Sequence, residues 1–478
     1  MSDTDPVIVV GSGAGGASVA YTLVNAGRPV LMLEKGGVLP RDGTTLDVKR
    51  VMKEGQFKNK EPWVNGQNQV FIPGEYYNLG GKTKWYGAAL LRYAPHEFLA
   101  DEEHQCLAWP FGYRELVPYY EEAERLLDVN HFDNEPELQA LIDRIVRADP
   151  HWKPDPLPLG LKREILNDEQ EAKHFDGFAS ACGYKSDAEW SLLDRIRDTP
   201  AFRVETGKTV NGLIHADGDP ARITGVRCTD GSSHRGSAVV LAAGAMSSSR
   251  ILQDHLAATG LETSLACAPL VGANFKMHLN SALIGFSPFS NQDVLRKTAI
   301  IFNEQYPHST VQCLGWIDGD ILGSELPAAV PKFVTRAMGA RAYGFFVTTE
   351  DGSSPDNRIV SGGGASYPLM DYDLQRIKPA AREHRRLVRA FTVRLLAAGL
   401  VGVDKYMGMA GTAHALGTMV TGDDPAASVV DACGRVHGMT GLYVGDGSVL
   451  PRSSRVNPAL SIYAWGLRLG RHLATAGR

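Results

Sequence analysis

The fold of this chain is decided by the stretch VIVVGSGAGGASVAYTLVNAGRPVLMLEKGG, residues 7–37. Its apolar start, residues 7–10, has the pattern of a strand buried in a parallel sheet. Gly11, Gly13 and Gly16 follow at the G-x-G-x-x-G spacing. In this motif the first glycine allows a tight turn, the second lets the backbone approach a pyrophosphate, and the third lets the next helix pack closely on the strand. The stretch therefore predicts a dinucleotide-binding turn.

The context of the glycines supports the same interpretation. A helix is predicted from Ala14, and its N-terminal N–H groups and dipole favour phosphate oxygens. Gly27 ends this helix, and a second apolar strand closes on Glu34. An acidic residue roughly 20 residues after the glycines is expected to accept hydrogen bonds from the ribose hydroxyls. The alternative is a βαβ unit with a structural role only.

The glycine motif does not distinguish NAD from FAD, but two later segments favour FAD. Residues 201–214, which include Val210, read as a pair of strands. Residues 236–256 read as an apolar strand, a turn of small residues that contains Ala243, and a helix. A second strand, turn and helix that return to the nucleotide domain are typical of large flavoproteins. Either segment alone is equally compatible with an ordinary sheet element.

Composition and charge exclude several other classes of protein. Of 478 residues, 44% are hydrophobic and 22% charged, as in ordinary globular proteins, whereas the 51 glycines exceed the usual share of roughly 7%. The net charge of −5 gives no basic surface for nucleic acid. Six cysteines spread singly predict no metal centre and no disulfide framework. The N-terminus lacks signal-peptide features and no apolar run reaches the ~20 residues of a membrane span, so a cytoplasmic location without membrane contact is expected.

Five further segments carry motifs in a defined order. They are YYNLGGKTKWYGAALLRY (76–93), AWPFGYRELVPYYEEAERLLDV (108–129), LVGANFKMHL (270–279), EDGSSPDNRIV (350–360) and GLYVGDGSVLPRSSRVNPALSIYAWGLRLGRHL (441–473). Together they resemble the glucose–methanol–choline (GMC) family of FAD-dependent alcohol oxidoreductases, and the second segment is similar to the sugar-oxidising branch. The resemblance implies an α/β fold in which a Rossmann-like FAD-binding domain is interleaved with a substrate domain built on an antiparallel sheet with helices.

The resemblance places the glycine pair Gly80 and Gly81 beside the isoalloxazine ring. Some members of the family bond the flavin covalently through a histidine four residues after this pair. The corresponding residue here is Trp85, so we expect FAD to be bound non-covalently. Lys82 and Lys84 are interpreted as solvated charges, with stabilisation of negative charge on the flavin as the alternative.

The last segment has a physical interpretation of its own. Asp446 ends an apolar strand and lies between two glycines, so its carboxylate and the backbone N–H of Gly447 suit the ribityl and phosphate region. Asn457 precedes Pro458, which disfavours helical dihedrals at Asn457 and opens a new helix. The N-terminal end of that helix would favour negative charge on a reduced flavin.

Oxidation of an alcohol needs a base and a group that holds the alcohol oxygen. The base takes the hydroxyl proton as a hydride leaves for flavin N5, and imidazole has a suitable pKa. An amide can hold the oxygen in a near-attack position. The resemblance implies His414 as the base and Asn457 as its partner. His278 is assigned either to the cofactor neighbourhood or to a structural role, and His437 to a surface turn.

The nucleotide domain is expected to comprise residues 1–100, 200–280 and 405–478, and the substrate domain residues 101–199 and 281–404. Residues 281–350 alternate apolar and polar, which predicts antiparallel strands with one face over the flavin. Residues 379–400 predict a helix on that sheet. Residues 130–200 are polar and rich in proline, and they read as loops that form a lid or a subunit contact.

These features predict an enzyme, an FAD-dependent dehydrogenase or oxidase acting on a hydroxyl group of a sugar, a glycoside or an aminoglycoside-like substrate. A sterol-like alcohol is the alternative substrate, because the histidine and asparagine pair also resembles sterol oxidases. A catalytically silent flavoprotein that transfers electrons or binds a partner is the alternative from another class. Either oxygen or another electron acceptor could reoxidise the flavin. The sequence is also compatible with an oligomer.

Overall fold

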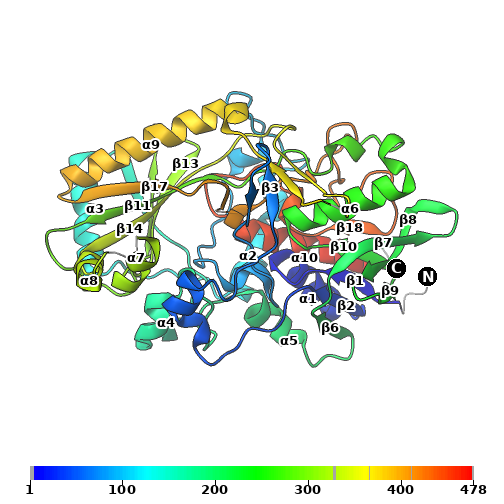
Figure 1. Cartoon of the computed structure of the whole chain (residues 1–478), viewed down its shortest axis with the longest axis horizontal. Coiled ribbons are helices and arrows are strands. Elements are labelled where there is room, and N and C mark those ends of the chain that lie inside the picture. The colour runs from blue at the N-terminus through cyan, green and yellow to red at the C-terminus, as the bar shows by residue number, and fades with distance from the viewer. Residues whose placement is uncertain (1–4, 327–329, 365, 411, 476–478) are drawn as a thin grey trace.

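Two large sheets, one in each half of the molecule, organise the fold (Figure 1). The computed structural model describes residues 5–326, 330–364, 366–410 and 412–475. One sheet is parallel and carries the glycine turn, and the other is antiparallel and faces it. The α/β class and the pairing of a Rossmann-like sheet with an antiparallel sheet agree with the prediction.

The parallel sheet has the strand order β18-β10-β1-β2-β6. Its strands are β1 (Val7–Val10), β2 (Val30–Glu34), β6 (Phe202–Thr206), β10 (Ala238–Leu241) and β18 (Leu442–Val444). All four neighbouring pairs are parallel. The central strands are apolar and buried throughout because helices cover both faces of such a sheet.

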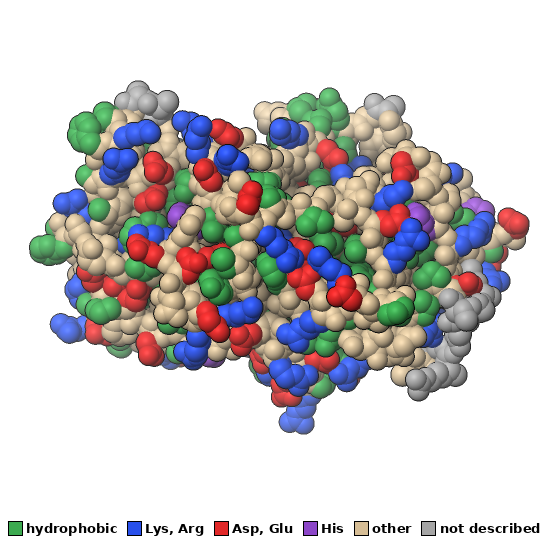
Figure 2. Space-filling model, turned by 90° about the horizontal axis from the view of Figure 1, so that it is seen from below, with side chains coloured by type: hydrophobic (Ala, Val, Ile, Leu, Met, Phe, Trp, Pro, Cys, Tyr) green, Lys and Arg blue, Asp and Glu red, His purple; other side chains and the backbone are tan. Residues whose placement is uncertain are grey.

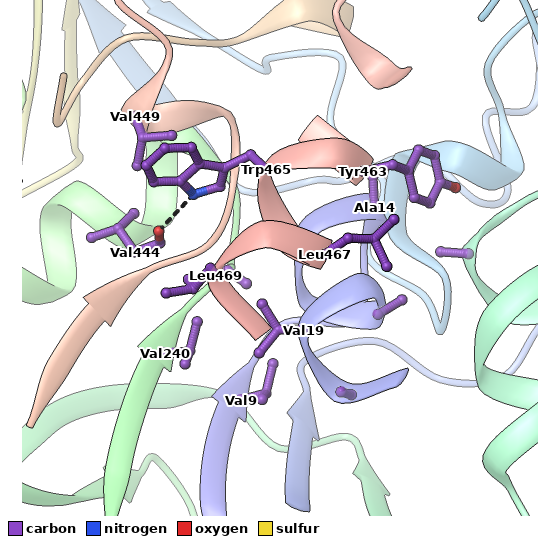
Figure 3. Packing of buried hydrophobic residues seen from close by; sticks show 14 of the residues in the cluster. Val9, Ala14, Val19, Val240, Val444, Val449, Tyr463, Trp465, Leu467 and Leu469 are labelled. Carbon is purple, nitrogen blue, oxygen red and sulfur yellow. Dashed lines mark hydrogen bonds between the residues drawn. The ribbon is translucent and has the colours of Figure 1, made fainter. Parts of the chain in front are cut away.

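Three helices pack on this sheet. They are α1 (Ala14–Asn25), α6 (Ala245–Thr259) and α10 (Ala459–Thr475). Figure 3 shows Leu469 of α10 beside Val240 of β10 and Val19 of α1, and Trp465 of α10 beside Val444 and Val449. The indole of Trp465 donates a hydrogen bond of 3.0 Å to the carbonyl oxygen of Val444, which ties α10 to β18. This contact fixes the C-terminal helix, and with it the segment that precedes the helix.

The antiparallel sheet has the strand order β17-β11-β14-β13-β12-β5. Its strands are β5 (Trp152–Pro156), β11 (Leu279–Phe286), β12 (Ala299–Asn303), β13 (Ser309–Cys313), β14 (Ala342–Thr349) and β17 (Val401–Tyr406). Along β14, Phe345 and Val347 point into a core shared with α3 (Pro136–Ala148) and α9 (Lys378–Ala397). Phe346 and Thr348 alternate with them and therefore point to the opposite face. That face looks toward the nucleotide-binding half.

Two smaller sheets and the remaining helices complete the fold. One sheet contains β3 (Trp63–Asn65), β4 (Val70–Phe71), β15 (Arg358–Val360) and β16 (Leu369–Asp371), and the other contains β7 (Val210–Ala216), β8 (Asp219–Cys228) and β9 (Ser233–Arg235). The other helices are α2 (Tyr113–Leu126), α4 (Glu169–His174), α5 (Asp194–Ile196), α7 (Gly319–Glu325) and α8 (Lys332–Gly339). In the described part of the chain, no helix is both long and apolar enough to cross a bilayer.

The interpretation of residues 130–200 as loops was wrong for α3, β5, α4 and α5. Residues 136–148 form α3, whose apolar residues enter the core of the antiparallel sheet. Residues 152–156 form β5 although they contain Pro154 and Pro156. Proline is tolerated there because β5 lies at the edge of the sheet, where an N–H on the outer side has no strand to bond.

The proposed domain boundaries cut across one of the smaller sheets. Strand β3, from the first nucleotide-binding segment, pairs with β16 from residues 281–404. The parallel sheet itself draws its strands from residues 1–100, 200–280 and 405–478. We keep the division into these segments as a proposal.

Candidate active site

The glycine turn is packed tightly on one side and open on the other. Gly11 adopts a φ of +100°, which favours glycine, and a Cβ there would collide with the backbone of Ala242. A Cβ at Gly16 would collide with the carbonyl of Gly11, and one at Gly15 with the carbonyl of Gly445. At Gly13, by contrast, a Cβ would have no atom within 4 Å. The open side at Gly13 is where a pyrophosphate is expected to lie.

The residues around this turn fit a dinucleotide. Helix α1 starts directly after Gly13, and no side chain caps its N-terminus, so its first N–H groups are available to phosphate oxygens. The buried carboxylate of Glu34 accepts hydrogen bonds from the Ser12 backbone N–H at 3.0 Å and the Gly36 N–H at 2.8 Å. Burial raises the pKa of Glu34, while these hydrogen bonds oppose the rise. Two carboxylate oxygens retain further capacity to accept hydrogen bonds from a ribose.

Four more predicted cofactor residues lie near this turn. Asp446 accepts hydrogen bonds from the Gly244 N–H at 2.8 Å and the Ser248 hydroxyl at 2.6 Å, so it joins β18 to the turn after β10. Ala243 lies in that turn and donates to the Ser248 hydroxyl at 3.0 Å. Gly447 begins a short turn directly after Asp446. Val210 starts β7, just after a loop in which Lys208 N–H donates to the carbonyl of Glu34.

The glycine pair lies directly against the phosphate turn. A Cβ at Gly81 would lie 3.0 Å from the Cα of Gly13. The next residue, Lys82, donates to Glu75 at 2.9 Å and to the carbonyl of Thr412 at 3.0 Å. The pair is therefore linked by direct contacts both to the phosphate turn and to the segment that carries His414.

The interpretation of Lys84 as a solvated charge was wrong. Its side chain is only 3% exposed and forms ion pairs of 3.0 Å with Asp187 and 2.6 Å with Glu189. Trp85 is buried, donates to the Asn78 side chain at 2.8 Å and stacks on Tyr76. The residue at the position of the flavin-bonding histidine is thus committed to protein contacts.

His414 lies against a second histidine, His278. Their Nδ1 atoms are 2.8 Å apart. The Nε2 atom of His278 lies 3.0 Å from the Ser453 carbonyl oxygen and 2.8 Å from the Ser454 carbonyl oxygen, and carbonyl oxygens can only accept. In neutral His278, Nε2 must therefore carry the proton and Nδ1 must accept one from His414 Nδ1. This arrangement leaves a lone pair on His414 Nε2.

The position of His278 is imposed by strained backbone and a buried ion pair. His278 adopts a φ of +64° and Ser454 a φ of +69°, which non-glycine residues rarely do. Behind them, Glu350 accepts from the Ser454 N–H at 3.1 Å and pairs with Arg452 at 2.6 Å. The Arg452 guanidinium, together with His308 and despite burial, holds the pKa of Glu350 well below its usual value. The turn that orients His278 is therefore anchored by charge.

The surroundings keep His414 neutral. Burial lowers the pKa of His414 well below 6.5, and the neighbouring His278, Lys82 and Lys297 lower it further. A neutral imidazole near pH 7 has a lone pair with which to take a proton. His414 is half-buried, so this lone pair is not sealed inside the core.

Asn457 approaches the same region from the segment just before α10. The amide of Gln312, in β13, donates a hydrogen bond to Asn457 Oδ1. Gln312 lies opposite Phe346 in the sheet, and the Phe346 ring is 6.4 Å from the His414 ring, edge to face. Because opposed residues share a face, His414 and Asn457 both approach the nucleotide-facing side of β13 and β14.

The start of α10 extends the site away from the phosphate turn. Gly466 packs so closely on α1 that a Cβ there would lie 2.6 Å from the Gly15 carbonyl oxygen. Asn457 precedes Gly466 by nine residues, which is about 13 Å along a helix. Pro458 and Asn457 thus lie about 13 Å from the point where α10 contacts α1, a distance that the ring end of a dinucleotide can span.

Two residues of the site had no signal in the sequence. Gln312 and Phe346 lie in alternating strands, and nothing in the alternation marks them as neighbours of Asn457 or His414. Glu350 opens the segment EDGSSPDNRIV, so its signal was available.

His437, interpreted as a surface residue, lies in a turn but is half-buried, and its Nε2 is 3.0 Å from the Gly422 carbonyl oxygen.

A second histidine pair lies behind this site and has a different geometry. The rings of His104 and His308 stack 3.7 Å apart at 12°, and Glu383 lies nearby. A metal ion lies in the plane of each imidazole that binds it, and two parallel stacked planes share no point. His308 instead pairs with Asp101 at 3.2 Å and Glu350 at 3.3 Å. We therefore interpret this pair as part of the charged support of the turn at residues 452–454.

Comparison with known proteins gives the class to which this site belongs. A family model described as FAD dependent oxidoreductase matches residues 6–275, and one described as GMC oxidoreductase matches residues 364–466. The chain belongs to the FAD-dependent oxidoreductases, and its C-terminal part carries the GMC oxidoreductase domain. It is therefore an enzyme that uses FAD to oxidise CH–OH groups.

Similar proteins cover nearly the whole chain. It is 29% identical to 6'''-hydroxyparomomycin C oxidase of Streptomyces lividus over 98% of this chain and 91% of that protein. It is 28% identical to paromamine 6'-oxidase of Streptomyces fradiae with the same coverage. Formate oxidase of Aspergillus oryzae RIB40 has a similar structure, with a TM-score of 0.73, 16% identity and 99% coverage of both chains, which bears on the fold alone.

One face of the molecule shows how charge is distributed on its surface. Figure 2 shows lysine and arginine side chains intermingled with aspartate and glutamate across this face. Apolar side chains lie between them. The charge pattern there is that of an ordinary enzyme surface, consistent with a small-molecule substrate.

Proposed function

We propose that this enzyme oxidises a hydroxyl group of an aminoglycoside-like sugar to a carbonyl. The observation that carries the chemistry is the bond between His278 and His414, which leaves His414 Nε2 free to act as a base. The substrate class is supported by the two full-length relatives, whose names describe the oxidation of paromamine and of a hydroxyparomomycin.

In the proposed reaction His414 Nε2 removes the hydroxyl proton of the substrate. The electron pair of the O–H bond becomes the second bond of the carbonyl as the C–H bond breaks. Bound FAD supplies the hydride acceptor. Asn457 holds the substrate oxygen: its Oδ1 is occupied by Gln312, so its Nδ2 is left to donate to that oxygen.

The sheet beside Asn457 favours a polar substrate over a sterol. Thr310 and Gln312 lie two residues apart in β13, so both side chains point to the face that contacts the C-terminal segment. Thr310 donates to the Arg455 carbonyl at 2.8 Å. Thr348 lies opposite Thr310 and donates to the Asn280 side chain at 3.0 Å. Thr310, Gln312 and Thr348 therefore offer a flat steroid no apolar side chain on which to pack.

A panel of alcohols tests this proposal. The purified yellow enzyme is mixed anaerobically with paromamine, simple sugars and cholesterol, and flavin absorbance is followed. We expect bleaching by paromamine, weaker bleaching by simple sugars and none by cholesterol. Bleaching by cholesterol alone would assign a sterol substrate. Bleaching by dithionite but by no alcohol would assign a silent flavoprotein.

The proposal includes the following further assignments. FAD is contacted by Gly11, Gly13, Ala14, Gly16, Glu34, Gly80, Gly81, Val210, Ala243, Asp446, Gly447, Asn457 and Pro458. It is bound non-covalently, so acid precipitation should leave the yellow colour in the supernatant. Oxygen or another acceptor reoxidises the flavin, and the enzyme works in the cytoplasm.

A further inference from the structure

Lys297 is a buried lysine next to the proposed active site. Its side chain is only 6% exposed and forms an ion pair of 2.8 Å with Asp176. The ammonium group packs on Gly87, where a Cβ would lie 1.9 Å from Lys297 Nζ. Gly87 belongs to the same segment as the glycine pair. Together with burial, which is the main cause, the charge of Lys297 lowers the pKa of His414. Lys297 is therefore near both the glycine-pair segment and the proposed base.

Asp176 joins Lys297 to the strand that holds Asn457. While Asp176 Oδ1 accepts from Lys297, its Oδ2 accepts from the Gly315 N–H at 3.0 Å. Gly315 follows Gln312 by three residues, at most about 10 Å of extended chain, and Gln312 donates to Asn457. Although burial opposes it, the Lys297 ammonium and the Gly315 N–H hold the pKa of Asp176 below its usual value. The carboxylate is thus charged at neutral pH and fixes the ammonium group.

The backbone before Lys297 is strained and firmly anchored. Arg296 adopts a φ of +55°, which non-glycine residues rarely do. Its guanidinium donates to the carbonyl oxygens of Asp293 at 2.6 Å, Asn291 at 3.0 Å and Ala342 at 3.2 Å. Strain of this kind persists where the surrounding structure enforces it, and it clusters at functional sites. The fold therefore accepts an energetic cost to place Lys297 where it lies.

The ammonium group of Lys297 has donors to spare. It carries three N–H donors, and in the part of the chain that the structure describes their single acceptor is Asp176 Oδ1. Lys185, also buried, uses all three of its donors. They bond to the carbonyl oxygens of Tyr86, Phe175 and Phe178. Buried donors in proteins are met by protein groups, by water or by a ligand. The position of Lys297 beside the proposed base points to a ligand oxygen.

We propose that Lys297 is a specificity-determining residue whose ammonium group donates a hydrogen bond to a second hydroxyl group of the substrate. This inference rests on the proposed oxidation of a sugar, whose first hydroxyl is held by His414 and Asn457. A sugar carries a second hydroxyl close to the first, and a hydroxyl oxygen can accept from an ammonium group. An amino group of the substrate, which is protonated at neutral pH, is disfavoured at this position because it would meet a like charge. Lys297 therefore selects an oxygen there.

The test combines a variant with modified substrates. Anaerobic stopped-flow reduction of the holoenzyme gives a limiting rate and a dissociation constant for paromamine and for analogues that each lack one hydroxyl group. Lys297→Met should lower the ratio of these constants for paromamine by about 10- to 100-fold, because a hydrogen bond from a charged donor is lost. One analogue, which lacks the hydroxyl that Lys297 binds, should react equally well with the variant and the wild type. The other analogues should lose as much as paromamine.

Two further variants separate recognition from structure. Lys297→Met leaves the Asp176 carboxylate without its counter-ion, so Asp176→Asn/Lys297→Met, which removes both charges, is measured as well and should show the same substrate pattern. Lys153→Met, in an exposed ion pair of the same sheet, is the control and should match the wild type. Flavin absorbance confirms that each variant is folded.

The outcomes distinguish this inference from the proposed function. An equal loss for paromamine and every analogue, or no loss at all, would assign Lys297 a structural role and overturn the inference. A wild type that is bleached by no sugar would overturn the proposed function, and the inference with it.

Discussion

At the scale of residues, the proposed base owes its state to its neighbours. His414 is neutral near pH 7 because burial and nearby positive charge disfavour its protonated form. Two backbone carbonyls hold the proton of His278 on Nε2, so His278 Nδ1 accepts a hydrogen bond from His414 Nδ1. The free lone pair of His414 is therefore on Nε2. The chemistry of one imidazole is thus set by groups that do not touch the substrate.

The first prediction concerns pH. Protonated His414 has no lone pair, so the rate of flavin reduction should fall as the pH drops through the pKa of His414. Because that pKa lies well below 6.5, the rate should be constant from pH 6.5 upward and fall only in more acidic solution. Anaerobic stopped-flow measurements across pH test this. Lys82→Met removes a positive charge and should move the acid limb to higher pH. A wild-type limb above pH 6.5 would contradict the assignment.

The second prediction concerns the orientation of Asn457. Glutamate at position 312 can only accept, so Gln312→Glu should turn the Asn457 amide and present its oxygen to the substrate. We expect flavin reduction to slow by about tenfold or more, with FAD retained. Gln312→Leu leaves the amide free to adopt either orientation and should have a smaller effect. Equal rates for Gln312→Glu and the wild type would remove Gln312 from this positioning role.

At the scale of elements, local chemistry explains what the sequence could predict. The glycine turn, β1 and β2 follow from spacing and apolar runs within 31 consecutive residues. Strand β5 was missed because its prolines argue against a strand unless the edge position is known, and that position is tertiary. Lys84 was misread for the same reason, because its partners Asp187 and Glu189 lie a hundred residues away.

The site was predictable in part. His414 and Asn457 were assigned by family resemblance, and the structure brings them to one face of the antiparallel sheet. The contact between His278 and His414 spans 136 residues and depends on a left-handed backbone at a non-glycine residue. Neither feature leaves a periodic signal. The sequence therefore identified His414 and Asn457, whereas the positions of the protons on His278 and His414 could be assigned only from the structure.

The third prediction separates the two roles of glycine in the phosphate turn. Gly13→Ala adds a methyl group to open space, so the protein should fold normally but bind FAD more weakly. Gly15→Ala forces a Cβ into the Gly445 carbonyl and should lower the stability of the apoprotein by about 1–3 kcal/mol. Urea unfolding of the apoproteins and FAD titration distinguish these effects. Unchanged FAD affinity in Gly13→Ala would contradict the placement of the pyrophosphate.

At the scale of the whole molecule, one buried ion pair joins the two halves. Glu350 follows β14 of the antiparallel sheet, and Arg452 lies in the segment between β18 and α10. Their bond therefore links the substrate sheet to the nucleotide sheet. The same pair supports the turn whose carbonyls orient His278, so stability and the geometry of the site depend on the same contact.

The fourth prediction follows from this pair. Glu350→Gln leaves the Arg452 charge buried without its partner and should lower the free energy of unfolding at pH 7 by about 3–5 kcal/mol. The pKa of Glu350 is lowered in the folded state, so its stabilising effect is present above pH 4.5 and is lost as the pH falls further. Urea unfolding should show the two proteins converging in acid. Glu304→Gln, in an exposed ion pair, is the control and should leave the free energy of unfolding nearly unchanged.

The central claim is that His414 removes the substrate proton. The most direct measurement is the anaerobic rate of flavin bleaching by paromamine in the wild type and in His414→Ala. We expect His414→Ala to remain yellow and folded but to bleach about 10²–10⁴ times more slowly, with His437→Ala bleaching at the wild-type rate. A His414→Ala enzyme that binds FAD and bleaches as fast as the wild type would contradict the account.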